Sequence, residues 1–210
     1  MSSKDIARIL LAIQAVTLKP ADPFTWASGL KAPIYCDNRL IMSHPAERRL
    51  IEQTLAELVK QEFPDVEVIA GTATAGIPHA AYVSWLLDLP MIYIRSNSKD
   101  HGKQSAIEGE LKSGQKVVLI EDLISTGGSV LEAARKVEEA GAHVLGCAAL
   151  FSYLLPQSKQ AFDEAGYPLV TLTDYQTLVD VAVHHEELKD YQETLESWYK
   201  DPVAWSAKQK

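Results

Sequence analysis

The chain has 210 residues, 47% of them hydrophobic, which fits one generous domain or a core with an appended lobe and excludes an intrinsically disordered chain. Its formal net charge of −8 disfavours nucleic-acid binding. Cys36 and Cys147 are too few for a disulfide scaffold and are typical of a reducing, cytoplasmic environment. Neither a signal peptide nor an apolar stretch of about 20 residues is recognisable, so we expect no membrane association.

The apolar residues predict helices and strands in alternation. Helical spacing of Ile6, Ile9, Leu10 and Ile13 predicts an amphipathic helix at the N-terminus. Beyond it, the same kind of pattern predicts helices over 51–60, 76–87 and 128–141, and strands over 66–71, 91–95, 116–122 and 143–151.

The two ends of the chain do not continue this alternation smoothly. We therefore expect a core at about 40–152, and a small hood lobe made of 1–39 and 153–210. One or two helices are expected in the C-terminal segment, and the last six residues, WSAKQK, are expected to fray. The histidines His79, His143, His184 and His185 lack the spacing of a zinc site and are expected to be structural.

Strands that are almost entirely apolar and are separated by helices indicate an α/β fold. Its central, mostly parallel sheet would be flanked by helices on both faces. Ligands of such sheets bind beyond the carboxyl ends of the strands. The loops after Gly71, Arg95 and Ile120 are therefore the candidate binding loops.

The stretch VVLIEDLISTGGSV (117–130) combines two carboxylates with a glycine turn. Ser125–Ser129 lead into a predicted helix N-terminus, whose free amides and dipole favour an anion. Glu121 and Asp122 would repel a phosphate, so we expect them to face a vicinal diol or hydrated Mg²⁺ instead. This pattern predicts a sugar-phosphate site; the alternative is an acidic helix cap followed by an ordinary turn.

Two other phosphate motifs are disfavoured. GTATAG (71–76) has the glycine spacing of a Walker loop, but Ile77 stands where Lys is required, and no dinucleotide-binding glycine pattern is present. The polar segment 95–109 concentrates the cations Arg95, Lys99, His101 and Lys103, which could stabilise a leaving pyrophosphate. The alternative for this segment is a solvated surface loop.

The stretch 117–130 resembles the signature of the type I phosphoribosyltransferases, which use 5-phosphoribosyl 1-diphosphate (PRPP). RSNSKDHG (95–102), FTWASGLKAPIYCDNR (24–39) and IAGTATAGIPHAAYVSWLL (69–87) resemble the orotate phosphoribosyltransferases. The resemblance implies the type I phosphoribosyltransferase fold and transfer of the phosphoribosyl group from PRPP to orotate. The products would be orotidine 5′-monophosphate and pyrophosphate, on the route to UMP. It also implies Mg²⁺ and a homodimer whose subunits share their active sites.

The resemblance also implies roles for individual residues. Lys99, His101 and Asp122 would be catalytic. PRPP would be bound by Arg95, Lys99, His101, Glu121, Asp122, Leu123, Ile124, Ser125, Thr126, Gly127, Gly128 and Ser129. The pyrophosphate loop would be formed by Thr72, Ala73, Thr74, Ala75 and Gly76. Orotate would be bound by Tyr35, Cys36 and Ser125.

Mg²⁺ would be carried by PRPP near Glu121 and Asp122, without an assigned protein ligand.

The sequence leaves two alternatives to the orotate reaction open. One is a purine-salvage phosphoribosyltransferase, which the basic loop and the segment 24–39 disfavour. The other is a non-enzymatic PRPP sensor on the same fold, which the acidic balance and the lack of an added DNA-binding module disfavour.

Overall fold

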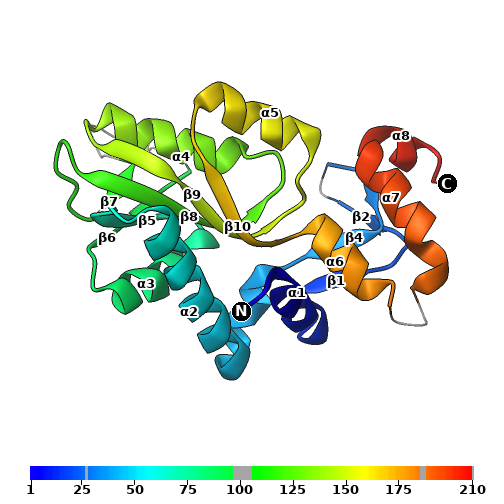
Figure 1. Ribbon diagram of the computed structural model, residues 1–210. Coiled ribbons are helices and arrows are strands. Elements are labelled where there is room, and N and C mark those ends of the chain that lie inside the picture. The colour runs from blue at the N-terminus through cyan, green and yellow to red at the C-terminus, as the bar shows by residue number, and fades with distance from the viewer. Residues whose placement is uncertain (27, 97–105, 185–187, 210) are drawn as a thin grey trace. The chain divides into compact units, whose positions relative to one another are not determined.

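The computed structural model describes residues 1–26, 28–96, 106–184 and 188–209 (Figure 1). The chain divides into two compact units, which are described separately: Pro45–Leu172, and Met1–His44 together with Thr173–Lys210. The predicted catalytic residues Lys99 and His101 lie outside the described residues. No helix in the described ranges is long and apolar enough to cross a membrane.

The larger unit is built on a six-stranded sheet with the strand order β10-β9-β8-β5-β6-β7. Its strands are β5 (Val68–Thr72), β6 (Met91–Ile94), β7 (Ile107–Glu108), β8 (Lys116–Ile124), β9 (His143–Ser152) and β10 (Leu169–Asp174). Its helices are α2 (Pro45–Glu62), α3 (Gly76–Leu87), α4 (Gly128–Glu139) and α5 (Pro156–Ala165). The pairs β5–β6, β5–β8 and β8–β9 are parallel, as predicted, whereas β7 runs antiparallel to β6.

The strand order changes direction at β5. The chain passes from β5 through α3 to β6 on one side of β5, and then returns to place β8 on the other side. A crevice at the carboxyl ends of the strands is expected where the order reverses. The fold therefore singles out the ends of β5 and β8 as the place for a ligand.

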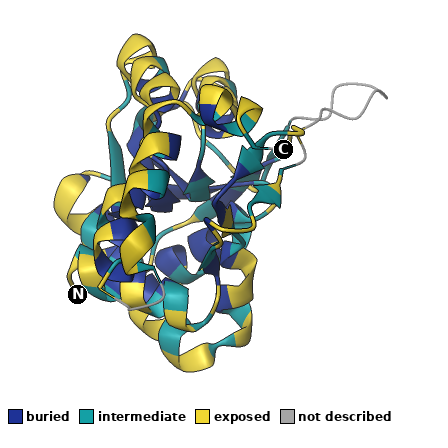
Figure 2. Ribbon diagram, turned by 90° about the vertical axis from the view of Figure 1, so that its right-hand side faces the viewer, coloured by how far each residue is buried: buried dark blue, intermediate teal, exposed yellow. Residues whose placement is uncertain are grey.

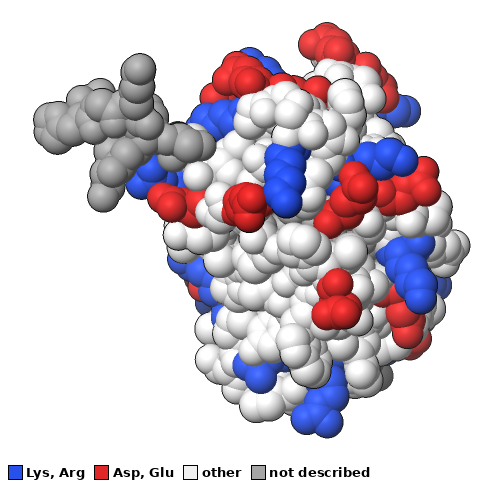
Figure 3. Space-filling view, turned by 90° about the vertical axis from the view of Figure 1, so that its left-hand side faces the viewer, with Lys and Arg blue, Asp and Glu red and all other residues white. Residues whose placement is uncertain are grey.

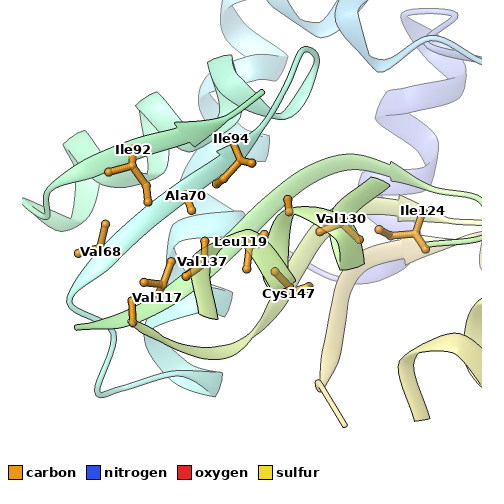
Figure 4. Packing of buried hydrophobic residues seen from close by; sticks show 14 of the residues in the cluster. Val68, Ala70, Ile92, Ile94, Val117, Leu119, Ile124, Val130, Val137 and Cys147 are labelled. Atoms are coloured by element: carbon orange, nitrogen blue, oxygen red, sulfur yellow. The ribbon is translucent and has the colours of Figure 1, made fainter. Parts of the chain in front are cut away.

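Helices cover both faces of this sheet, with α4 and α5 on one face and α2 and α3 on the other (Figure 1). Alternate strand residues turn toward α4, because successive side chains of a strand point to opposite faces. Figure 4 shows this packing for Val68, Ala70, Val117 and Leu119, all fully buried. Burial is concentrated in the strands, and the helices keep their outer sides exposed (Figure 2).

Helix α4 shows why the periodicity of the sequence predicts the fold. Val130, Ala133, Ala134 and Val137 are its buried residues, and their spacing of 3, 4 and 7 places them on one face. The following Gly141 has a φ of +85°, a left-handed conformation that ends the helix as predicted.

The smaller unit combines short strands with terminal helices. Its strands β1 (Val16–Leu18) and β4 (Ile34–Cys36) pair antiparallel, as do β2 (Phe24–Thr25) and β3 (Lys31–Ala32). Its helices are α1 (Ser3–Ala12), η1 (Asn38–Ser43), α6 (Tyr175–Ala182), η2 (Lys189–Tyr191), α7 (Gln192–Lys200) and α8 (Pro202–Ala207). Trp198 is fully buried and lies against both Tyr175 and Trp26.

Three expectations from the sequence are corrected. The alternation continues past Ser152, because α5 and β10 belong to the sheet unit, which extends to Leu172 rather than to about residue 152. Strand β8 continues to Ile124, because Leu123 and Ile124 still pair with β9. The C-terminal tail does not fray at Trp205, since α8 includes that side chain and only 5% of it is exposed.

Candidate active site at the ends of β5 and β8

The loop after β5 and the carboxylates of β8 meet through a close backbone contact. Gly71 and Ile120 are register partners in the parallel pair β5–β8. A Cβ atom added to Gly76, the first residue of α3, would stand 2.4 Å from the carbonyl oxygen of Ile120. Only glycine permits this approach, so the predicted pyrophosphate loop Thr72–Gly76 lies directly beside Glu121.

Glu121 is a buried acid at the edge of the site. It is 6% exposed, and its Oε1 accepts a hydrogen bond of 3.1 Å from the amide of Asp122. The hydroxyl of Ser129 lies 3.5 Å from its Oε2. Burial, together with the charge of Asp122, raises the pKa of Glu121 to about 9. A cation or a hydroxyl-rich ligand beside it would favour the ionised carboxylate.

The turn between β8 and α4 presents amides to the same edge. Gly127 precedes α4 with a φ of +85°, and it has no side chain that could cap the first turn. Thr126, Gly128 and Ser129 are exposed, and Ser125 is partly buried. The free amides of a helix start, with the helix dipole, favour an anion, so the turn remains the candidate phosphate cradle.

The side chains of this motif do not all face the site. Ile124 is 1% exposed and belongs to the hydrophobic core below α4. Leu123 is paired with Phe151 in the sheet. Any contact of Ile124 with a ligand must therefore come from its main chain, whereas the hydroxyls of Ser125, Thr126 and Ser129 are accessible in part or in full.

Arg95 follows β6 at the same edge of the sheet. Thr72 and Ile94 are register partners, and the amide of Ala73 donates to the carbonyl oxygen of Ile94 at 2.9 Å. The Nε atom of Arg95 lies 3.1 Å from Oε1 of Glu108 on β7. The structure thus brings three predicted parts together: the pyrophosphate loop, the carboxylates with the glycine turn, and Arg95.

The predicted base-site residues belong to the other unit. Tyr35 and Cys36 are in β4, where Tyr35 is 45% exposed and its ring lies 5.5 Å from that of Phe24. Cys36 is partly buried and is not in a disulfide.

Phe162 and Lys136 were not among the residues that the sequence singled out. The ring of Phe162 on α5 supports the glycine turn: a Cβ on Gly127 would stand 2.8 Å from its Cε2. Lys136 on α4 donates to the carbonyl oxygens of Arg95 and Ser96. Pro156, the first residue of α5, and Gly166, which follows its last residue, are the ordinary start and stop signals that could have identified that helix.

This arrangement can hold an anion and a hydroxyl-bearing or metal-bearing group at the same time. The described residues contain no cluster of three or more His, Cys, Asp or Glu side chains that could enclose a metal ion. Two neighbouring carboxylates nevertheless suit Mg²⁺, which binds proteins through one or two carboxylates and completes its shell with water and substrate phosphates.

Comparison with known proteins gives a consistent result. A family model of the phosphoribosyl transferase domain matches residues 40–185. An orotate phosphoribosyltransferase of Listeria monocytogenes is 57% identical over 203 residues, which cover 96% of this chain and 97% of that protein.

Solved structures show the same fold. The UMP synthase of Leishmania donovani matches with a TM-score of 0.79 and 28% identity, over 95% of this chain and 42% of that longer chain. The orotate phosphoribosyltransferase of Aeropyrum pernix matches with a TM-score of 0.76 and 24% identity, over 86% of this chain and 99% of that chain.

Proposed function

The chain belongs to the phosphoribosyltransferase family and, within it, to the orotate phosphoribosyltransferases, and from this premise we propose how its residues perform the reaction. The enzyme transfers the 5-phosphoribosyl group of PRPP to orotate and releases pyrophosphate, a step toward UMP. The observation that carries the assignment of the site is the pairing of two carboxylates with an amide-rich turn where the strand order reverses.

The 5-phosphate of PRPP binds the turn Ser125–Ser129. The amides and hydroxyls of this turn donate to the phosphate, and the positive end of the α4 dipole faces the phosphate. Glu121 and Asp122 then accept from the two ribose hydroxyls. Their negative charge also stabilises the positive charge that develops on the ribose ring as the bond to pyrophosphate lengthens.

Mg²⁺ suits the same carboxylates. Glu121 and Asp122 would lie next to the ion, which PRPP would carry. When bound, the ion supplies positive charge that offsets the charge of the diphosphate. The raised pKa of Glu121 fits this role, because a carboxylate that is buried beside another acid requires a nearby cation or several donors to ionise.

Pyrophosphate leaves toward the loop Thr72–Gly76 and a group of cations. Arg95 lies at the same sheet edge as this loop and is the described member of that group. We assign Lys99 as the main catalytic cation and His101 as its supporter, on the resemblance of the segment 95–102 to the family's loop. Positioning of the reactants supplies much of the rate.

Orotate is assigned to Tyr35, Cys36 and Ser125. Tyr35 offers an accessible aromatic ring beside Phe24, suited to stacking on a planar base. Ser125 is next to the phosphate turn and is accessible in part.

We further propose a homodimer with shared active sites. Helices α2 and α3 carry exposed apolar surface: Leu50 on α2 is 44% exposed, and Trp85 and Leu86 on α3 are 76% and 36% exposed. A groove of about 370 Å³ lies beside them, lined by Arg48 and Tyr82 among others, and the Arg48 guanidinium lies 5.0 Å from the ring centre of Tyr82. A second copy of the chain would cover this surface.

Nucleic acid and membranes are not expected as partners. Figure 3 shows acidic and basic side chains interspersed on the face that it presents, without a continuous basic patch. We assign the enzyme to the cytoplasm because two cysteines are too few for a disulfide scaffold and are typical of a reducing compartment.

Consumption of orotate, followed by absorbance with PRPP and Mg²⁺ present, tests the function. We expect turnover that depends on all three components. Turnover of a purine base instead would favour a salvage enzyme, and tight PRPP binding without turnover of any base would favour a sensor.

A further inference from the structure

Lys136 forms an unusual link between the phosphate-binding helix and the end of a neighbouring strand. Its Nζ donates to the carbonyl oxygen of Arg95 at 3.1 Å and to that of Ser96 at 3.2 Å. A third group, Oε1 of Glu132, lies 4.0 Å away, one turn earlier on α4. An ammonium has three donors, and here two of them bind consecutive main-chain carbonyls.

The side chain of Lys136 is held much more closely than other paired lysines of the described chain. It is 18% exposed, whereas Lys4, Lys112 and Lys116 are 57%, 71% and 44% exposed. Fixing a lysine side chain costs up to about 2 kcal/mol of rotamer freedom. Charge-assisted hydrogen bonds to two carbonyls offset that cost, so the arrangement is a specific contact rather than a solvated surface cation.

Several contacts hold Arg95 in place. The amide of Arg95 donates to the carbonyl oxygen of Ala106 at 2.9 Å, and its own carbonyl accepts from Lys136. Its side chain lies against Glu108. Arg95 is therefore fixed through its amide, its carbonyl and its guanidinium, and Ile94 before it is bonded to the pyrophosphate loop at Ala73.

We propose that Lys136 is a positioning residue: by binding the carbonyls of Arg95 and Ser96, it aims the Arg95 guanidinium at the diphosphate of PRPP. The proposal rests on the function assigned above, in which Arg95 contacts that diphosphate. The contact anchors Arg95 to α4, the helix whose first turn is assigned to the 5-phosphate, without altering that turn.

The test compares Lys136→Met, which keeps the apolar stem and removes the donors, with Lys136→Arg, which keeps a cation. Arg135→Met is the matched control, because it removes a neighbouring cation of α4 that is 67% exposed and pairs with Glu132. Isothermal titration measures the binding of pyrophosphate with Mg²⁺ and, separately, of ribose 5-phosphate.

Lys136→Met is expected to weaken pyrophosphate binding about tenfold, the loss typical of a misplaced charged contact. Its affinity for ribose 5-phosphate should stay within about twofold, because the turn 125–129 is unaltered. Lys136→Arg should recover most of the pyrophosphate affinity, and Arg135→Met should match the unaltered enzyme. An unchanged pyrophosphate affinity in Lys136→Met, or a parallel loss for both ligands, would overturn the proposal.

A double variant separates this proposal from the function on which it rests. If Lys136 acts through Arg95, then Arg95→Gln with Lys136→Met binds pyrophosphate no more weakly than Arg95→Gln alone. Additive losses would mean that Lys136 acts by another route. Should Arg95→Gln bind pyrophosphate normally while orotate is still consumed, the contact of Arg95 is wrong and Lys136 has nothing to position, but the enzyme function stands.

Discussion

Gly76 approaches Ile120 so closely that a Cβ atom on the glycine would stand 2.4 Å from the Ile120 carbonyl oxygen and 3.3 Å from the Cα of Glu121. The obstacle is backbone of the central strand, which cannot rotate away. Gly76→Ala must therefore displace α3 or β8. We expect a loss of about 1–3 kcal/mol of stability, as for other overpacked sites, and a melting temperature lower by about 2–4 °C for each kcal/mol.

Gly128→Ala provides the control for stability. The nearest atom to its added Cβ is Oγ1 of Thr126, at 3.9 Å, which is ordinary van der Waals contact. Its melting temperature should remain within about 2 °C of that of the unaltered enzyme, because nothing has to move. If differential scanning calorimetry finds both variants equally stable, the tight packing of Gly76 on β8 is disproved.

The buried pair of His79 and Glu52 is expected to be structural. Nδ1 of His79 lies 2.6 Å from Oε1 of Glu52, and both side chains are at most 2% exposed. Burial raises the pKa of Glu52, and the hydrogen bond and charge of His79 act against that rise. His79→Leu removes the opposing contribution and leaves an uncompensated buried acid, for which we expect a loss of about 3 kcal/mol.

The pH dependence of this variant follows from the pKa. The pKa of Glu52 is higher in the folded protein than in the unfolded chain, so folding favours its protonated form. The contribution of Glu52 to the free energy of unfolding is therefore present at low pH and is lost as pH rises. The destabilisation of His79→Leu should therefore grow between about pH 5 and pH 8 in urea unfolding. A loss that is constant over this range would show that Glu52 is not the source.

Much of the larger unit follows from periodicity in the sequence. The four buried residues of α4 repeat at helical spacing. The apolar runs predict β5, β6, β8 and β9, and each predicted strand end lies within two residues of the end in the structure. In contrast, β10 is only partly buried over Leu169–Thr171, because it forms the edge of the sheet, so its sequence carries a weaker signal.

The sequence predicts which loops form the candidate site, but not which strands and side chains lie next to those loops in the fold. The rule for parallel sheets placed the loops after Gly71, Arg95 and Ile120 at one edge, but the strand order that puts β8 beside β5 is a property of the tertiary fold. The contact between Lys136 and Arg95 joins residues 41 positions apart. No local pattern encodes such a pair.

Glu121→Gln should raise the stability of the protein at pH 8 and lower its activity. The pKa of Glu121 is raised to about 9 by burial and by Asp122, so the folded protein binds a proton more strongly than the unfolded chain does. Stability from this group is complete below about pH 4.5 and is lost progressively toward pH 9. The uncharged glutamine avoids this loss, and the variant should gain at least ~1 kcal/mol, or about 2–4 °C, at pH 8.

Thermal unfolding of Glu121→Gln at pH 5 and pH 8 measures the effect. The advantage of the variant should shrink toward pH 5, because near the ordinary pKa of 4.5 the unfolded chain also begins to bind the proton that the folded protein holds. Orotate turnover should fall by at least about tenfold, because the amide cannot replace a carboxylate beside Mg²⁺ and the ribose diol. A variant that is less stable at pH 8 than at pH 5, relative to the native enzyme, would contradict the assignment of the raised pKa.

Trp85→Glu tests the proposed dimer surface. Trp85 is 76% exposed on α3, and a charge placed there would be buried without a partner if a second copy covers this helix. We expect sedimentation velocity to show monomers of the variant at micromolar concentration, and dimers of the unaltered chain under the same conditions. Val203→Glu on α8, where the native side chain is 60% exposed, is the control and should remain dimeric; a dimeric Trp85→Glu would exclude this face.

Sharing of active sites between subunits is tested by mixing two inactive enzymes. Lys99→Ala removes the assigned catalytic cation, and Asp122→Asn removes a carboxylate beside the ribose, so each homodimer should lose about 99% or more of its turnover. If the segment that carries Lys99 serves the partner's site, a mixed dimer contains one site with both defects and one site with neither. After the two variants are mixed and their subunits exchange, about a quarter of the native activity should return, because half of the dimers are mixed and each has one intact site. Activity that stays at the level of the separate variants, although labelled subunits are seen to exchange, would place Lys99 and Asp122 of the same subunit in one site.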